Sequence, residues 1–196
     1  MADFWLYFNI GLRHVLNFNG YDHVLFLLVL TVPYMFKDWR NILILATLFT
    51  IGHTASLVLT VYGVVTIKPQ FIEFLIPVTI LCTALYNIFA ASKKTAAKGG
   101  NINFLAITTL FFGIIHGLAF GKDFKILVMG DDSKLAPLLE FALGIECAQL
   151  IVVLATLLLA FICQGFLRVQ KRDWILVLSA FVAGVIVPMI INSAIW

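Results

Sequence analysis

Six long apolar segments, separated by short polar connectors, constrain the fold of this chain more than any other feature. They cover residues 22–36, 40–65, 71–91, 102–121, 135–163 and 174–195. A helix needs about 20 mostly apolar residues to cross a hydrocarbon core of about 30 Å. We therefore expect an all-α integral membrane protein with six transmembrane helices.

A shorter apolar segment, residues 4–18, precedes the first expected span. It is interrupted by Asn9, Arg13, His14 and Asn17. Fifteen residues of α-helix rise only about 22 Å, which is less than the thickness of the hydrocarbon core. The sequence therefore predicts a short N-terminal helix that is interfacial or re-entrant.

Composition supports a membrane protein and argues against a separate soluble domain. Hydrophobic residues make up 62% of the 196 residues, charged residues 12%, and the mean hydropathy is +1.06. Soluble domains carry about 25% charged residues. We expect residues 1–196 to form a single polytopic membrane domain. Nucleic-acid binding is not expected, because the net charge of +3 is distributed over short connectors. The three cysteines lie in apolar segments and indicate no disulfide framework.

The distribution of Lys and Arg predicts the orientation of the chain. Connectors one, three and five carry eight of these residues: Lys37, Arg40, Lys93, Lys94, Lys98, Arg168, Lys171 and Arg172. Connectors two and four carry four: Lys68, Lys122, Lys125 and Lys134. Positive charge concentrates on the cytoplasmic side of a membrane protein. We therefore expect both termini outside, in the inner (cytoplasmic) membrane of a bacterium.

All four histidines of the chain lie within or beside the apolar segments, at positions 14, 23, 53 and 116. Ionisable residues at membrane depth are costly and usually face the protein interior, where they serve a function. On the predicted topology, the histidines fall in the outer half of the membrane, together with Asp22, Glu73 and Glu146. The sequence therefore predicts one buried site for a metal ion. The expected ligands are His14, Asp22, His23, His53, His116 and Glu146, with supporting roles for Glu73, Gln149, Thr50 and Ser56.

Other roles are open for several of these residues. His14 could reach the interface beside Arg13, and Asp22 could serve as the N-cap of the first span. His53 could be satisfied by Thr50 or Ser56, one turn away on its helix. The glycines beside His116 could serve helix packing alone. Glu146 could be protonated and inert, hydrogen-bonded to Gln149, and Glu73 could simply be solvated.

Five motifs resemble those of the HupE/UreJ family of hydrogenase and urease accessory membrane proteins. They are GLRHVLNFNGYDHVLFLLVL, FTIGHTASL, FIEFLIPVTI, FFGIIHGLAFG and FALGIECAQL. Together they contain every predicted ligand and supporting residue. Two details depart from the family pattern: Thr54 and Ser56 stand where the family has Ser and Thr, and Pro77 interrupts the stretch after Glu73. The resemblance implies transport or handling of nickel or cobalt.

Imidazole and carboxylate ligands without thiolates suit nickel, cobalt, zinc, iron or copper ions, and ligand type does not choose among them. We interpret the chain as a permease rather than an enzyme. Its expected partners are the lipid bilayer and the metal ion, with a second copy of the chain or metalloenzyme-maturation proteins as further candidates. The alternative is an intramembrane metalloenzyme, a zinc- or iron-dependent hydrolase in which Glu146 acts as general base. A metal sensor or accessory subunit is a third interpretation.

Overall fold

The computed structural model describes residues 2–17, 20–92, 102–131 and 133–193. The regular structure in these ranges is entirely helical, as predicted. Its elements are α1 (Ala2–Val15), α2 (Asp22–Thr31), the 3₁₀ helix η1 (Phe36–Asp38), α3 (Trp39–Val61), α4 (Pro69–Ser92), α5 (Ile102–Leu127), α6 (Leu135–Phe161), the π-helical turn η3 (Ile162–Phe166) and α7 (Lys171–Ile191).

Among the described residues, five helical segments are long and apolar enough to cross a membrane. They are Phe36–Val61, Pro69–Ser92, Leu105–Leu127, Leu135–Phe166 and Lys171–Ile191. The chain is therefore an integral membrane protein. The sixth predicted span, 22–36, is not confirmed. Its only α-helix, α2, has 10 residues and rises about 15 Å, half the thickness of the hydrocarbon core.

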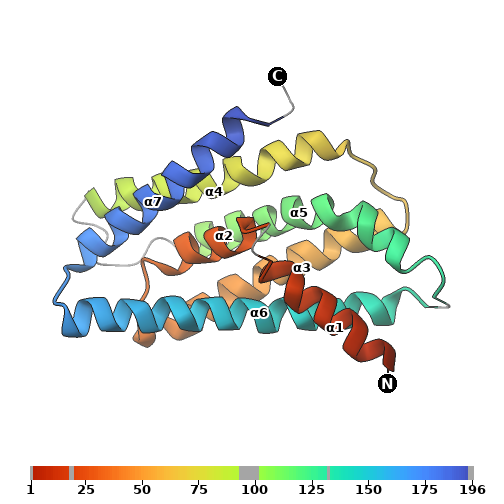
Figure 1. Cartoon of the computed structure of the whole chain (residues 1–196), viewed down its shortest axis with the longest axis horizontal. Coiled ribbons are helices and arrows are strands. Elements are labelled where there is room, and N and C mark those ends of the chain that lie inside the picture. Colours follow the sequence, from red (N-terminus) through yellow and green to blue (C-terminus); the bar gives the residue numbers. More distant parts are fainter. Residues whose placement is uncertain (1, 18–19, 93–101, 132, 194–196) are drawn as a thin grey trace.

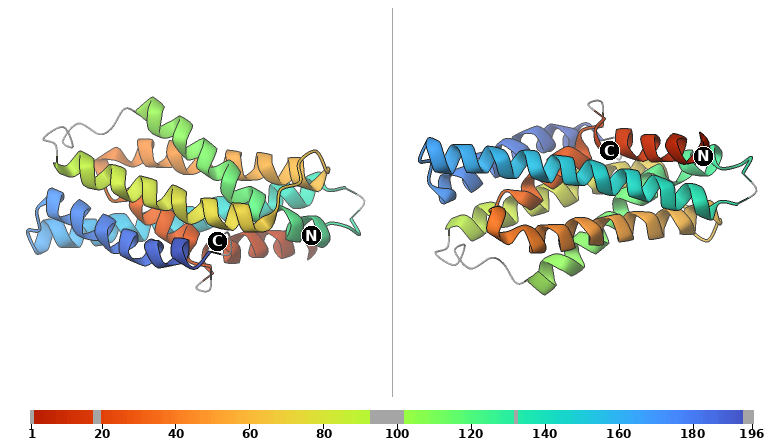
Figure 2. Two further views of the ribbon diagram at one scale, coloured as in Figure 1. Left: turned by 90° about the horizontal axis from the view of Figure 1, so that it is seen from above. Right: turned by 90° about the horizontal axis from the view of Figure 1, so that it is seen from below.

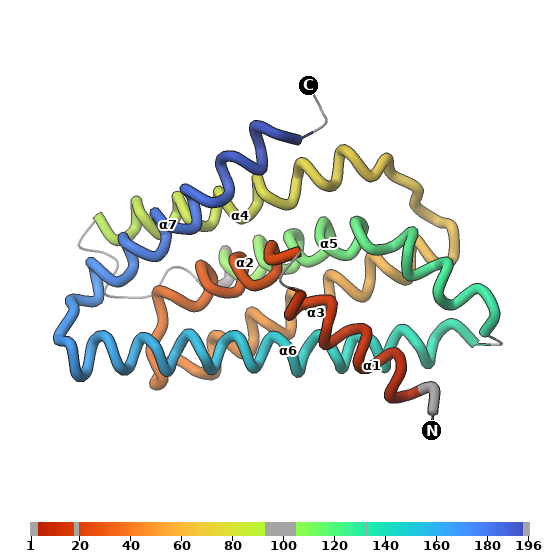
Figure 3. The backbone as a smooth tube through the Cα atoms, viewed as in Figure 1, coloured from red at the N-terminus to blue at the C-terminus, as the bar shows by residue number. Residues whose placement is uncertain are grey.

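Helices α1 and α2 share one passage along the bundle (Figure 1). The first residues of α1 lie at the same end as the α3–α4 and α5–α6 connections, and we call this the α1 end. From there α1 runs to about the middle of the bundle, where the chain turns and α2 continues to the opposite end, the α2 end (Figures 2 and 3). We expected Asp22 and His23 to open a span from its outer edge. They lie instead at an interior break between two half-length helices.

Two helix pairs near this break are in backbone contact. In the α3–α5 pair, a Cβ on Gly52 would overlap the carbonyl oxygen of Leu110, and a Cβ on Gly117 would overlap that of His53. In the α1–α6 pair, a Cβ on Gly144 would overlap the carbonyl oxygen of Phe8. Only glycine permits backbones this close, so these positions fix how the helices cross.

Several predicted boundaries need correction. The fourth span was expected to end at residue 121, but α5 continues to Leu127. Lys122, Asp123 and Lys125 therefore lie on a helix and not in a connector. Most of the expected connector 92–101 lies outside the described residues. The three cysteines, as predicted, are free.

Candidate metal centre

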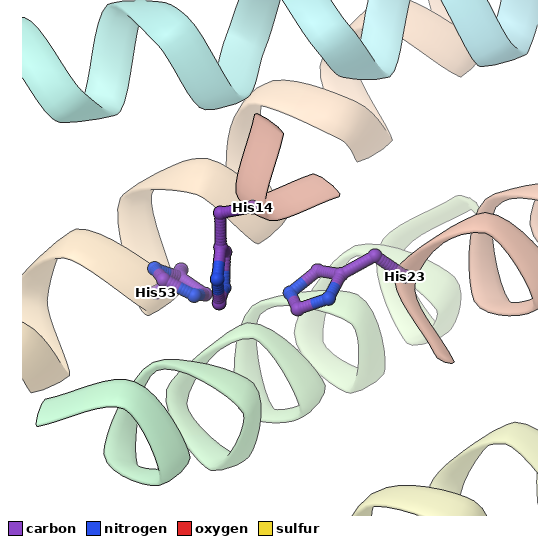
Figure 4. Close-up of side chains that lie close together, drawn as sticks. All are labelled: His14, His23 and His53. Atoms are coloured by element: carbon purple, nitrogen blue, oxygen red, sulfur yellow. The ribbon is translucent and has the colours of Figure 1, made fainter. Parts of the chain in front are cut away.

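The imidazoles of His14, His23 and His53 converge at the break between α1 and α2. Each comes from a different helix: α1, α2 and α3 (Figure 4). The ring centroid of His14 lies 4.7 Å from that of His23 and 5.6 Å from that of His53, and the His23 and His53 centroids are 5.8 Å apart. One nitrogen from each ring lies within 4.8 Å of the other two. Small side-chain movements would bring all three onto one ion, because metal–imidazole bonds measure about 2.0–2.1 Å.

The fourth histidine, His116 on α5, extends this cluster. Its ring centroid is 5.2 Å from that of His23. The Nδ1 atom of His116 lies 2.8 Å from the carbonyl oxygen of Phe112, one turn earlier on the same helix. A carbonyl oxygen only accepts hydrogen bonds, so Nδ1 carries the proton and Nε2 keeps a free lone pair.

The Asp22 carboxylate similarly determines which ring nitrogen of His23 carries the proton. Its Oδ1 atom accepts a hydrogen bond from the His23 backbone N–H at 3.0 Å and lies 3.2 Å from His23 Nδ1. A carboxylate in this position holds the proton on Nδ1 and raises the basicity of Nε2 as a ligand. Asp22 was also considered as the N-cap of its helix, but that position is taken by Tyr21. The Asp22 carboxylate contacts the histidine ring and also accepts the hydrogen bond of the His23 backbone N–H in the first turn of α2.

The imidazole nitrogens that face this centre are buried without a hydrogen-bond partner. This holds for Nε2 of His14, His23 and His116 and for both ring nitrogens of His53. His53 is fully buried, with 0% of its surface exposed. Buried polar atoms in proteins are almost always satisfied, so an unsatisfied group requires an explanation, such as a role as a metal ligand. The alternative in which Thr50 or Ser56 satisfies His53 is wrong: Ser56 donates to the backbone carbonyl of His53, and Thr50 donates to Glu146.

Phenylalanines that the sequence did not single out surround the imidazoles. The ring centroid of Phe120 is 4.3 Å from that of His14, and that of Phe49 is 5.1 Å from that of His116. Phe141 lies 5.6 Å from His14 and 6.2 Å from His53. This wall keeps water from the nitrogens and lowers the local dielectric constant. Its sequence signal is one-turn spacing, because Phe49 precedes His53 by four residues and Phe120 follows His116 by four.

Glu146 on α6 belongs to a separate polar cluster with α3. Its carboxylate accepts hydrogen bonds from the hydroxyls of Thr47 at 2.7 Å and Thr50 at 2.5 Å. Gln149 Nε2 donates to Thr50 Oγ1 at 3.0 Å. We expected Gln149 to bond Glu146 directly, but Thr50 stands between them. Thr47 was missed altogether, although its three-residue spacing from Thr50 could have revealed it.

Glu73 is not part of the group of convergent ligand atoms formed by His14, His23 and His53. It is exposed on α4, near the start of that helix. The interpretation of Glu73 as a surface residue agrees with this position.

The fold and the centre define a class: a polytopic helical membrane protein with a buried cluster of imidazoles at a broken helix. A family model described as "HupE / UreJ protein" matches residues 1–193, and the chain belongs to this family. Membership relates the chain to nickel- and cobalt-associated accessory membrane proteins. Searches of curated proteins and of solved structures gave no significant match.

Proposed function

We propose that this protein is a permease for a divalent transition-metal ion of the nickel or cobalt type, with the ion as its cargo. The observation that carries the proposal is the set of unpartnered imidazole nitrogens that four helices bring to one buried point. His14, His23 and His53 would bind the ion, with His116 as a fourth ligand. Three or four imidazoles leave coordination positions open, as a transit site requires if the ion is to leave again.

Two negative charges at the break between α1 and α2 support a cation, and Asp22 offsets the partial positive charge of the α2 N-terminus. The C-terminal end of α1 carries partial negative charge, and His14 lies in its last turn. Asp22 contributes a formal negative charge beside His23. Ion sites formed by interrupted helices near the bilayer midplane recur in transporters for this reason.

The route begins at the α1 end in our proposal. The positive charge pattern favours this end as the outer side, with both termini outside in a bacterial inner membrane. An ion that enters there would pass along α1 to the imidazoles at the break between α1 and α2. Release on the other side, to a metalloenzyme-maturation partner, completes the proposed handling role.

An enzymatic role finds less support. A hydrolase would need Glu146 beside the metal as general base. The hydrogen bonds of its carboxylate go instead to Thr47 and Thr50. We therefore propose neither a catalytic role nor a direct ligand role for Glu146, and assign it to the packing of α3 against α6.

Nickel uptake by proteoliposomes tests the proposal. His53→Ala and His116→Ala should each abolish uptake and lower the number of nickel ions retained by the purified protein, which elemental analysis measures. The exposed Glu73→Gln variant is the control and should transport normally. Undiminished uptake by both histidine variants would remove the proposed mechanism.

A further inference from the structure

A second group of buried polar side chains lies in the half of the bundle that contains α2. Helices α2, α4, α6 and α7 each contribute one member, and all four side chains are neutral. They are Thr31 (1% exposed), Asn87 (4%), Thr156 (5%) and Ser179 (0%).

Each of these side chains lies within four residues of the apolar cluster at the α2 end, which joins the same four segments. That cluster contains Val32, Ala91, Ala160 and Ile175. On α4, α6 and α7, the polar residue and the cluster member are four residues apart and therefore share one helix face. Because α2 packs against α4, α6 and α7, the three helices that carry Asn87, Thr156 and Ser179 all adjoin the helix that carries Thr31. We call them the polar layer.

The hydrogen bonding of the polar layer is incomplete. The hydroxyls of Thr31 and Ser179 are buried and have no partner. Thr156 donates to the carbonyl of Val152 on its own helix, and Asn87 Nδ2 donates to the carbonyl of Val29 at 2.6 Å. An unsatisfied hydroxyl in a membrane interior costs free energy that an alanine or valine would avoid. Packing alone therefore does not explain why positions 31 and 179 are polar.

We propose that the polar layer is a second station for the transported ion, between the imidazole centre and the α2 end. This inference rests on the proposed function. The hydroxyl oxygens of Thr31, Thr156 and Ser179 and the amide oxygen of Asn87 would hold a divalent ion that retains part of its water shell. Neutral oxygens bind nickel or cobalt more weakly than imidazoles do, so the ion is held here only briefly before release. Successive sites of moderate or low affinity are what conduction requires.

The first test removes the oxygens and keeps the shape. A triple variant, Thr31→Val, Thr156→Val and Ser179→Ala, is compared with Thr79→Val, a buried α4 position outside the polar layer whose hydroxyl bonds to Ile76. The triple variant should retain the nickel bound at the imidazoles in detergent. Its nickel uptake into proteoliposomes should fall by about tenfold, which corresponds to about 1.4 kcal/mol. Thr79→Val should leave both quantities unchanged.

Three outcomes of this test count against the inference, and each is distinct. Uptake by the triple variant within about twofold of the unmodified protein, which corresponds to less than about 0.5 kcal/mol, would show that the ion does not use the layer. Loss of bound nickel together with uptake would assign the layer a structural role. Absence of uptake by the unmodified protein would overturn the permease proposal itself.

A second test uses a milder substitution, for the case in which the triple variant does not fold. In a background with Cys82, Cys147 and Cys163 replaced by serine, Ser179→Cys should react with a small water-soluble thiol reagent. Val182→Cys, three residues away on α7 and equally buried, is the matched control. Because a path for a hydrated ion must admit water, Ser179→Cys should react about tenfold faster than the control. Equal rates would contradict a hydrated station at this level.

Discussion

The α3–α5 and α4–α7 pairs hold their helices together in different ways. In α3–α5, glycines bring the backbones into contact, and the same stretch carries His53 and His116. In α4–α7, contact is made by apolar side chains such as Ile76, Ile80 and Ile186. The one glycine of α7, Gly184, has no atom of another residue within 4 Å of the point where a Cβ would lie, apart from its own helix and chain neighbours. The α3–α5 pair, which carries His53 and His116, is thus fixed by backbone geometry, and the α4–α7 pair by adaptable side chains.

The largest effect should follow from breaking the α3–α5 contact. Gly117→Ala places a methyl group against the carbonyl oxygen of His53 and the hydroxyl of Ser56, so the two helices must separate. We expect loss of nickel binding and a destabilisation of about 1–3 kcal/mol. Elemental analysis and thermal unfolding in detergent measure the two effects. Gly184→Ala is the matched control and should bind nickel normally; equal behaviour of the two variants would refute the comparison.

A smaller effect should follow when α1 alone is displaced. Gly144→Ala forces α1 away from α6, because the new methyl group meets the backbone of Phe8. This moves His14 and leaves His53 and His116 in place, so nickel should bind more weakly but not be lost. Titration calorimetry would detect the change. An affinity equal to that of the unmodified protein would show that His14 is not a ligand.

The Asp22→Asn substitution tests the carboxylate without moving a helix. Asparagine keeps the shape of the side chain but removes the charge that orients and activates His23. Loss of such a partner typically weakens metal binding by about 10–100-fold. The measurement is nickel affinity at constant pH. A variant that binds as tightly as the unmodified protein would limit Asp22 to a local backbone role.

The smallest effect is expected at the α3–α6 polar cluster. Thr47→Val removes one hydrogen bond to Glu146 and leaves that of Thr50. The stability should fall by about 0.5–1.5 kcal/mol, with nickel stoichiometry unchanged. Thermal unfolding would measure the stability, and elemental analysis of the same sample would measure the nickel stoichiometry. Loss of the bound ion would indicate that Glu146 contributes to metal binding.

The sequence predicted the helical membrane class because long apolar runs with few charges have no other stable fold. It also identified the four histidines, since an ionisable group is conspicuous in such a run. It did not predict the short α2. Residues 24–36 are almost entirely apolar, but Pro33 has no backbone N–H with which to continue the helix, and α2 ends at Thr31. A hydropathy profile indicates which residues lie in an apolar environment, but it does not indicate where one helix ends and the next begins.

Sequence alone thus determined which side chains are too costly to leave unused in a bilayer, and that the glycines beside His116 could let another helix approach closely. Tertiary structure decided which of those side chains meet. It joined His14, His23 and His53 at the break between two half-helices, and it directed Glu146 to two threonines on α3. The reason is geometric. Hydrogen bonds and metal sites depend on how helices distant in sequence rotate and cross. The apolar faces that set this rotation have similar residue patterns along the sequence, so the sequence does not distinguish them.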